Sequence, residues 1–276
     1  MKSKHDIIWL DTIDSTNEEA RRRISDIDNL SVLSARSQTS GKGQRGNIWS
    51  SAPGENLTLS IILKFALSAL ETVGNASEIL PPLQAYDQFA ISEIAALSVV
   101  DFLAGHDIEA RIKWPNDIYV GKRKICGILI ENSLRGEYLA SSIVGIGLNV
   151  NQRNFDVSLP NPTSMALCIN QQEVSADGAV SPLDIEECIE ELTDIFKKYV
   201  RRYTRQTGGL LKLRRLYLSQ LWRLDEPARF TDQRVSPSGR EFTGTIRGLS
   251  DVGNLLIETE EGELREFAFK EIGYII

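Results

Sequence analysis

The sequence predicts an α+β protein with a larger domain over residues 1–226 and a small β domain over 227–276. Two observations predict this organisation. Apolar segments with strand spacing and with helix spacing both occur through the first region, which is typical of a mixed domain. After Glu226-Pro227 the pattern changes to five short apolar runs, and most of the turns between them contain glycine. Such a pattern is typical of a small all-β unit.

The larger region is expected to begin with a short strand and a helix. Ser15 followed by Glu18 forms a capping-box pattern, which predicts a helix that runs to about Ile24. Apolar side chains at helical spacing over 88–104 predict a long second helix, and Gly105 is a natural end. Further strands are expected over 7–10, 31–36, 56–64, 108–113, 117–120, 125–132 and 140–150, and further helices over about 182–199 and 208–223.

The small domain is expected to be an SH3-like barrel. Its five strands are expected over 228–235, 241–249, 253–259, 263–268 and 272–276. Turns at Ser238-Gly239, 251–254 and 260–262 separate neighbouring strands, as short strands of an antiparallel sheet require.

Composition excludes several classes of function. The formal net charge of −7 argues against a general nucleic-acid binder, so no DNA partner is expected. The three cysteines are widely spaced and form no CxxC pair, which favours free thiols in a reducing cytosol. Only two histidines occur, which weakens a histidine-based metal cluster or a Ser/His triad. No apolar run approaches the roughly 20 residues of a membrane span, so we expect a cytoplasmic protein without a membrane partner.

A glycine-rich loop over 37–49 is the most informative segment. Gly41, Gly43 and Gly46 leave backbone amides uncovered, and Lys42 and Arg45 add positive charge beside them. Uncovered amides and cations together are what an anion-binding loop needs. The alternative is a surface loop that is merely rich in glycine.

Four further motifs accompany this loop. They are Asp14-Ser15-Thr16-Asn17 before it and, in order after it, Lys113-Trp114-Pro115-Asn116-Asp117, the run from Gly121-Lys122-Arg123-Lys124 to Glu131, and Gly145-Ile146-Gly147-Leu148-Asn149-Val150-Asn151. The ordered set resembles the biotin–protein ligases, strongly over 9–151 and more weakly to the C-terminus. Because the first motif begins at Asp14, the resemblance is to the shorter class that lacks an N-terminal DNA-binding domain.

The resemblance implies a fold and a reaction. The fold would be a mixed-sheet catalytic domain of the biotin/lipoate-ligase type, similar to class II synthetases, followed by the SH3-like unit. The reaction would activate biotin with ATP and Mg²⁺ as biotinyl-5′-AMP. The biotinyl group would then pass to a lysine of the biotin carboxyl carrier domain of a carboxylase. Such chemistry depends on positioning and charge stabilisation and needs no covalent enzyme intermediate.

The resemblance also assigns biotin-binding residues. The ureido head would meet hydroxyls and amides, and the carboxylate would meet cations and loop amides. The residues so assigned are Ser15, Thr16, Asn17, Gln38, Lys42, Gly43, Gln44 and Lys124. Read alone, Ser15 and Thr16 are helix caps, Gln38 is a surface residue and Lys124 is a solvated turn residue.

The nucleotide-binding residues implied by the resemblance are Arg45, Asn116, Asp117 and Asn149, with Asp117 also a possible Mg²⁺ ligand. Lys124 and Arg45 are the expected catalytic residues. Lys42 and Gln44 stand where the family more commonly has arginine, so one bidentate guanidinium and one charge are lost.

Other functions remain open at this point. A lipoate–protein ligase shares the fold and the chemistry, and a non-catalytic biotin-binding module would use the same pocket. A P-loop NTPase does not fit, because the chain contains no Gly-x4-Gly-Lys-Ser/Thr motif.

Overall fold

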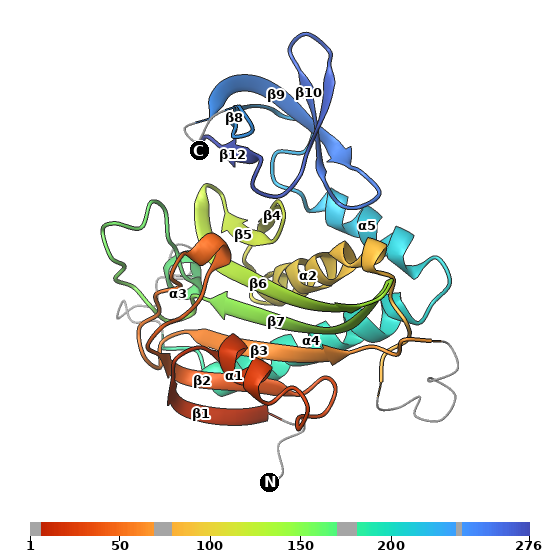
Figure 1. Ribbon diagram of the computed structural model, residues 1–276. Coiled ribbons are helices and arrows are strands. Elements are labelled where there is room, and N and C mark those ends of the chain that lie inside the picture. Colours follow the sequence, from red (N-terminus) through yellow and green to blue (C-terminus); the bar gives the residue numbers. More distant parts are fainter. Residues whose placement is uncertain (1–6, 69–78, 170–180, 236–238) are drawn as a thin grey trace.

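The computed structural model describes residues 7–68, 79–169, 181–235 and 239–276. Two sheets organise the chain (Figure 1), a seven-stranded sheet of order β1-β2-β3-β7-β6-β5-β4 and a five-stranded sheet of order β11-β10-β9-β8-β12. The large sheet is mixed, because β1 pairs with β2 in parallel and every other neighbouring pair is antiparallel. The expected α+β class with a mixed main sheet is confirmed.

The strands of the large sheet follow the expected segments closely. They are β1 (Ile7–Ile13), β2 (Val32–Gln38), β3 (Leu57–Lys64), β4 (Arg111–Lys113), β5 (Asp117–Val120), β6 (Arg123–Arg135) and β7 (Tyr138–Leu148). Every residue of β3 except Lys64 is buried. Such full burial explains its nearly continuous apolar sequence, since both faces of the strand are covered.

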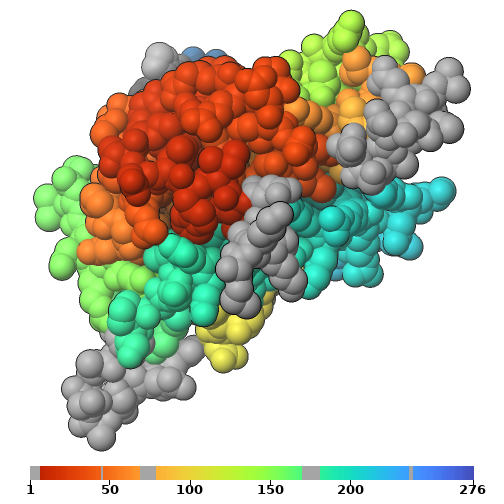
Figure 2. All heavy atoms as spheres, turned by 90° about the horizontal axis from the view of Figure 1, so that it is seen from below, coloured from red at the N-terminus to blue at the C-terminus, as the bar shows by residue number. Residues whose placement is uncertain are grey.

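The two faces of the large sheet carry different helices. Helix α1 (Thr16–Arg22) contacts β2, β3 and β7 on one face. Helices α2 (Phe89–Gly105) and α4 (Ile185–Thr204) pack against the sheet, and α5 (Gly209–Ser219) packs on both of them beneath the small sheet (Figure 1). Short helical segments complete the chain: η1 (Gln44–Gly46), η2 (Ala85–Asp87) and α3 (Met165–Ile169). Seen from below, the N-terminal segment forms one red and orange block beside the green-blue α4 (Figure 2).

Helix α2 is the central helix of the core. Twelve of its 17 residues are buried, which explains why its sequence is apolar on all sides rather than on one stripe. Among the described residues, Ala85–Gly105 is the one stretch long and apolar enough to span a membrane, but 67% of its most apolar window is buried inside the protein. The apolar sequence of this helix is therefore explained by its position in the core.

Two helix starts differ from the expectation. Ser15 is the N-cap residue of α1, but its side chain makes no capping hydrogen bond, and the helix ends at Arg22 rather than near Ile24. The capping box fails because Glu18 pairs with Arg21 and Lys42 instead. Helix α4 begins at Ile185 because Asp184 accepts hydrogen bonds from the backbone amides of its first turn.

The small sheet contains all five expected strands. They are β8 (Pro227–Asp232), β9 (Arg240–Leu249), β10 (Leu255–Thr259), β11 (Leu264–Phe267) and β12 (Ile272–Tyr274), and all are antiparallel. Strands β11 and β12 are the two edges of the described sheet, so its hydrogen bonding is that of an open SH3-like unit rather than a closed barrel.

One hydrophobic core extends through both sheets. Phe230, Ile246 and Phe267 of the small sheet belong to the same buried cluster as the residues of α2 and β3. The connecting segment 220–224 also hydrogen-bonds to both sheets. Ile112 N donates to Gln220 O (2.8 Å) and Trp222 N donates to Ile112 O (2.8 Å), while Leu224 forms a bridge with β9. The small sheet is therefore packed onto the large one.

Candidate active site

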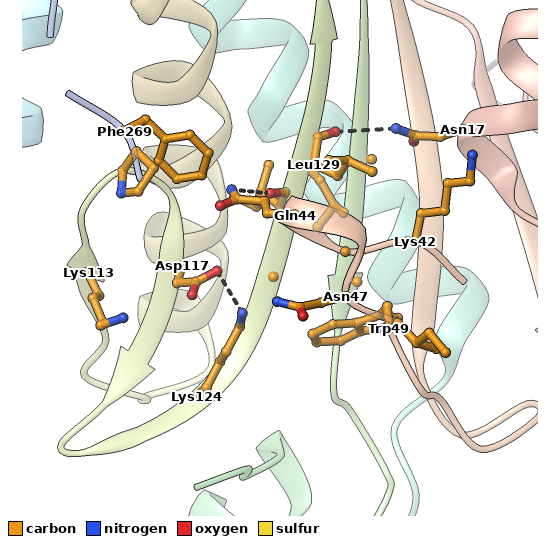
Figure 3. A pocket seen from close by; sticks show the side chains of 18 of the residues that line it. Asn17, Lys42, Gln44, Asn47, Trp49, Lys113, Asp117, Lys124, Leu129 and Phe269 are labelled. Carbon is orange, nitrogen blue, oxygen red and sulfur yellow. Dashed lines mark hydrogen bonds and ion pairs between the residues drawn. The ribbon is translucent and has the colours of Figure 1, made fainter. Parts of the chain in front are cut away.

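A cavity of about 310 Å³ opens on the face of the large sheet that carries α1. Its lining residues come from the segments 15–17, 38–49, 113–117, 124–129, 145–147 and 269–274. Figure 3 shows Asn17 and Lys42 at one side and Lys113, Asp117 and Phe269 at the other, with Gln44, Asn47 and Trp49 between them. We call the first side the polar end and the second the charged end.

The polar end is organised around the start of α1. Gln38 Oε1 accepts hydrogen bonds from Thr16 N (2.8 Å) and Thr16 Oγ1 (3.3 Å). Ser15, Thr16 and Asn17 are each at most 4% exposed, yet all three line the cavity. The amide Gln38 is thereby fixed beside three small polar residues without any formal charge among them.

Asn17 is held by a second set of contacts. Its Oδ1 accepts from Ser60 Oγ (2.6 Å), and its Nδ2 donates to Glu131 Oε2 (2.8 Å) and to Leu129 O (3.4 Å). A Cβ placed on Gly145 would lie 2.2 Å from Asn17 Oδ1, so any larger residue there would have to displace the Asn17 amide. Sequence analysis missed Ser60, although a serine inside an otherwise apolar strand is a recognisable sign of a buried polar contact.

The glycine-rich loop is a compact turn rather than an extended arm. Gly43 N donates to Asn47 O (2.7 Å), and Trp49 N donates to Gly41 O (2.9 Å). A Cβ on Gly41 would lie 2.4 Å from Trp49 O, which explains the first glycine. Gln44 Nε2 reaches across the cavity floor to Ile128 O (3.0 Å) and to Asn116 Oδ1.

Trp49 lies flat on the sheet. A Cβ on Gly147 or Gly127 would lie 2.4 Å or 2.8 Å from the indole ring, so these two glycines create the space that the ring occupies. Lys124 Nζ lies 5.8 Å from the centre of the same ring, within cation–π range. The indole therefore stands between the polar end and Lys124.

Lys42 lies at the polar end, where its ammonium pairs with Glu18. This contact, together with the nearby Arg21, lowers the pKa of Glu18. Lys42 is thus apart from Lys124, although both were expected to meet the same carboxylate (Figure 3). The structure therefore distributes the two lysines over the two ends of the cavity.

Lys124 and Asp117 form the ion pair of the charged end, with Nζ and Oδ1 2.7 Å apart. The backbone of Lys124 is fixed, because Lys124 N donates to Asn161 O (2.7 Å) and Thr163 N donates to Lys124 O (2.9 Å). The contact with Lys124 uses one oxygen of Asp117. A carboxylate with a second oxygen fits the usual magnesium site, in which one or two carboxylates combine with phosphate oxygens.

Two expected residues do not line the cavity. Asn116 is 3% exposed and does not line the cavity, although its side chain accepts a hydrogen bond from Gln44. Asn149 is also buried and outside the lining, because its Nδ2 donates to Thr163 O (2.9 Å). The side chain of Arg45 falls outside the described part of the structure.

The small sheet contributes a wall that sequence analysis missed. Phe269, Ile272, Gly273 and Tyr274 line the charged end, and we call them the C-terminal wall. Lys113 Nζ lies 4.8 Å from the ring centre of Tyr274. No local motif marks these residues, because only the packing of the two sheets brings them to the cavity.

Among the described residues that line the cavity there is no cysteine and no histidine. Burial raises the pKa of the Cys126 thiol, and Cys168 and Cys188 are also buried. Within the described residues, no group of three or more His, Cys, Asp or Glu side chains could hold a metal. The arrangement can bind a ligand with a neutral polar head at one end and place anionic groups beside cations at the other.

Comparison with known proteins agrees with this arrangement. Residues 9–149 match the biotin/lipoate A/B protein ligase family, and residues 235–272 match the biotin protein ligase C-terminal domain. The bifunctional ligase/repressor BirA of Bacillus spizizenii is 30% identical over 259 residues, which cover 93% of this chain and 70% of that protein. The biotin–[acetyl-CoA-carboxylase] ligase of Paracoccus denitrificans is 28% identical, over 90% of this chain and 92% of that one.

Among solved structures, the biotin protein ligase of Aquifex aeolicus in complex with biotin and ATP is similar over 98% of both chains. Its TM-score is 0.71 and its identity 25%. The matched segment 9–149 contains the polar end, the loop and the charged-end turn, and the second match overlaps the C-terminal wall. The chain therefore belongs to the biotin/lipoate A/B protein ligase family and has the two-part architecture of its biotin protein ligases.

Proposed function

We propose that this chain is an ATP-dependent biotin–protein ligase. The observation that carries the proposal is one cavity with the uncharged groups of Thr16, Asn17 and Gln38 at one end and the Lys124–Asp117 ion pair at the other, with the glycine-rich loop between them. Biotin has matching parts, a neutral ureido head and a carboxylate tail. The similarity to ligases whose names specify biotin, among them the Paracoccus denitrificans protein and the Aquifex aeolicus structure, supports biotin over lipoate.

Biotin would lie with its ureido group at the polar end. Thr16, Asn17 and Gln38 offer an uncharged set of donors and acceptors that is already hydrogen-bonded in place, so little ordering is needed on binding. The aliphatic chain would pass over Trp49 and the glycines of β6 and β7. Ser15, Lys42, Gly43 and Gln44 would complete the site from the loop side.

ATP would lie at the charged end. Lys124 would neutralise the carboxylate and α-phosphate, Arg45 would add a second charge, and Asp117 would face the nucleotide directly. Asn116 and Asn149, whose side chains lie outside the cavity lining, would support the nucleotide site from behind it through their contacts with Gln44 and Thr163. Mg²⁺ would be held by Asp117 together with phosphate oxygens, where it supplies charge neutralisation of the triphosphate. The Asp117–Lys124 pair keeps both groups oriented before the substrates arrive.

In the first step, a biotin carboxylate oxygen attacks the α-phosphorus of ATP and the bond to pyrophosphate breaks. Lys124 stays next to the oxygens on which negative charge accumulates, and the loop excludes water from the mixed anhydride. In the second step, the amine of a carrier lysine attacks the anhydride carbonyl and AMP leaves. The attacking amine loses its proton to solvent, and the described cavity offers no histidine for this role.

The two parts of the chain would have different roles. Residues 1–226 would bind biotin and ATP, and residues 227–276 would complete the nucleotide end through the C-terminal wall. The partner would be the biotin carboxyl carrier domain of a carboxylase. The reaction would take place in the cytoplasm, where ATP and reduced cysteines coexist.

The test is pyrophosphate exchange with purified protein, ATP and Mg²⁺, with biotin or lipoate as the acid. Biotin-dependent exchange, followed by labelling of a carrier domain, is the expected result. Exchange with lipoate alone would make the chain a lipoate ligase. Biotin binding without exchange would reduce it to a binding module.

A further inference from the structure

One turn of the small sheet is seated on the helices of the large one. Residues 250–254, between β9 and β10, form this anchor turn, and Figure 1 shows the blue sheet above α2 and α5. Gly253 has φ +90°, and a Cβ there would lie 2.3 Å from Cγ of Phe89. The backbone of the turn therefore rests directly on the Phe89 ring, which only glycine permits.

Arg214 of α5 clamps the anchor turn. Its Nη1 donates to Ser250 O (2.8 Å) and its Nη2 to Asp251 O (3.4 Å), while its Nε pairs with Glu93. Glu93 is 1% exposed, so the guanidinium is fixed from the side of the core. A single side chain thereby joins α2, α5 and the small sheet.

The anchor turn reaches the active site through Trp114. Trp114 Nε1 donates to Gly253 O (2.9 Å), and on the other side Tyr217 Oη donates to Pro115 O (2.6 Å). Both Trp114 and Tyr217 are at most 5% exposed. The two hydrogen bonds fix the turn that carries Asp117 into the cavity, one from the small sheet and one from α5.

We infer that Arg214, Gly253 and Tyr217 are positioning residues for the nucleotide. They fix the positions of the Trp114–Asp117 turn and of the C-terminal wall. They act on the nucleotide through the turn and the wall and do not contact substrate. The inference rests on the proposed function. Because the polar end is built from α1, β2, β3, β6 and β7, substitution of these positioning residues should leave biotin binding unchanged.

Tyr217→Phe tests this inference with little change of volume. The ATP KM of pyrophosphate exchange should rise about 5- to 10-fold, the scale of one buried hydrogen bond that holds a binding group. The biotin Kd, measured by calorimetry without ATP, should stay within twofold. Tyr199→Phe is the matched control, since its hydroxyl donates to Asp101 Oδ2 (2.6 Å) away from the cavity and should alter neither constant.

Arg214→Lys is the second variant, because lysine keeps the charge beside Glu93 but cannot donate to both turn carbonyls. The same selective loss of ATP affinity is expected. An unchanged ATP KM in folded Tyr217→Phe and Arg214→Lys proteins would overturn the inference, and so would an equal loss of biotin affinity. Absence of exchange in the wild-type protein would instead refute the proposed function.

Discussion

The two ends of the cavity are built in different ways. The polar end is made by neighbouring strands and one helix of a single sheet, and its side chains are hydrogen-bonded to one another. The charged end is made by a turn, a strand and a wall from the other sheet, joined through the anchor turn. The difference teaches that binding of the neutral head depends on one sheet, whereas binding of the anionic groups depends on how two sheets meet.

Lys124→Ala should have the largest effect on catalysis at the charged end. Removal of one preorganised charge next to the reacting phosphate should reduce the rate of biotin-dependent pyrophosphate exchange by about 10²-fold or more. Lys122→Ala, an exposed neighbour at the same β-turn, is the control and should retain normal exchange. Near-normal exchange by Lys124→Ala would remove Lys124 from the reaction.

Gly145→Ala should weaken biotin binding at the polar end instead. The added methyl group would lie 2.2 Å from Asn17 Oδ1 and must displace it, so biotin affinity should fall at least about tenfold, the scale of one lost hydrogen-bonding group. The control is Gly105→Ala at the end of α2, where the nearest atom to the new Cβ is 3.5 Å away. Calorimetry with biotin alone would contradict the prediction if both variants bound equally well.

Glu93→Gln tests whether stability at the anchor turn depends on pH, because Glu93 is the buried partner of Arg214, which holds that turn. Burial raises the pKa of Glu93 from 4.5 to about 7, with Arg214 opposing the shift and Asp87 adding to it. A carboxyl with a raised pKa in the folded state stabilises the fold at low pH, and that stability is lost as pH rises from about 4.5 to 7.

Relative to Glu93→Gln, the wild-type free energy of unfolding should therefore fall by about 3 kcal/mol at most between pH 4.5 and pH 8. Urea denaturation of both proteins at several pH values measures the difference. A difference that does not change with pH would show that Glu93 does not titrate in this range.

Gln44→Arg should have the smallest effect on the reaction. Gln44 lies between the polar end and the charged end of the cavity (Figure 3). Gln44 already reaches Ile128 O across the cavity floor, so a charged side chain there should hold the adenylate more tightly and slow its release a few-fold. The release rate of biotinyl-5′-AMP measures this. Unchanged release would indicate that the residue at this position does not contact the intermediate.

The same loop offers a measurement of order. The backbone hydrogen bonds within residues 41–49 are internal, among them those between Gly41 and Trp49 and between Gly43 and Asn47, and the loop buries little apolar surface of its own. Hydrogen exchange over 40–48 should therefore slow when biotin is added, since the ligand supplies further partners for the loop. Equal protection with and without biotin would contradict this expectation.

Sequence alone predicted what is local in this fold. The segment Ser15–Asn17, the glycine loop and Lys124 were identified from motifs and all lie at the cavity, and every expected strand is present. Their functional assignment came from the resemblance, since a lysine in a turn or a serine at a helix start has a simpler structural explanation in each case.

The missed features are those created by tertiary contacts. Trp49 lies against Gly127 and Gly147, which are about 80 and 100 residues further along the chain. The expected capping box is absent, because Glu18 forms an ion pair with Lys42 of the glycine-rich loop, a contact that the local sequence does not reveal. The C-terminal wall could not be found at all, since it depends on how one sheet is packed on another.

The connecting segment 220–222 has a consequence beyond the active site. It pairs with β4, the last strand of the large sheet, through the two hydrogen bonds at Ile112. An uncovered strand edge recruits other chains by offering unpaired amides and carbonyls. A polypeptide that ends before Gln220 would leave this edge open beside buried apolar residues, so prematurely terminated chains should self-associate into aggregates. The same few residues that join the sheets thus also keep the edge of the large sheet from pairing with other copies of the chain.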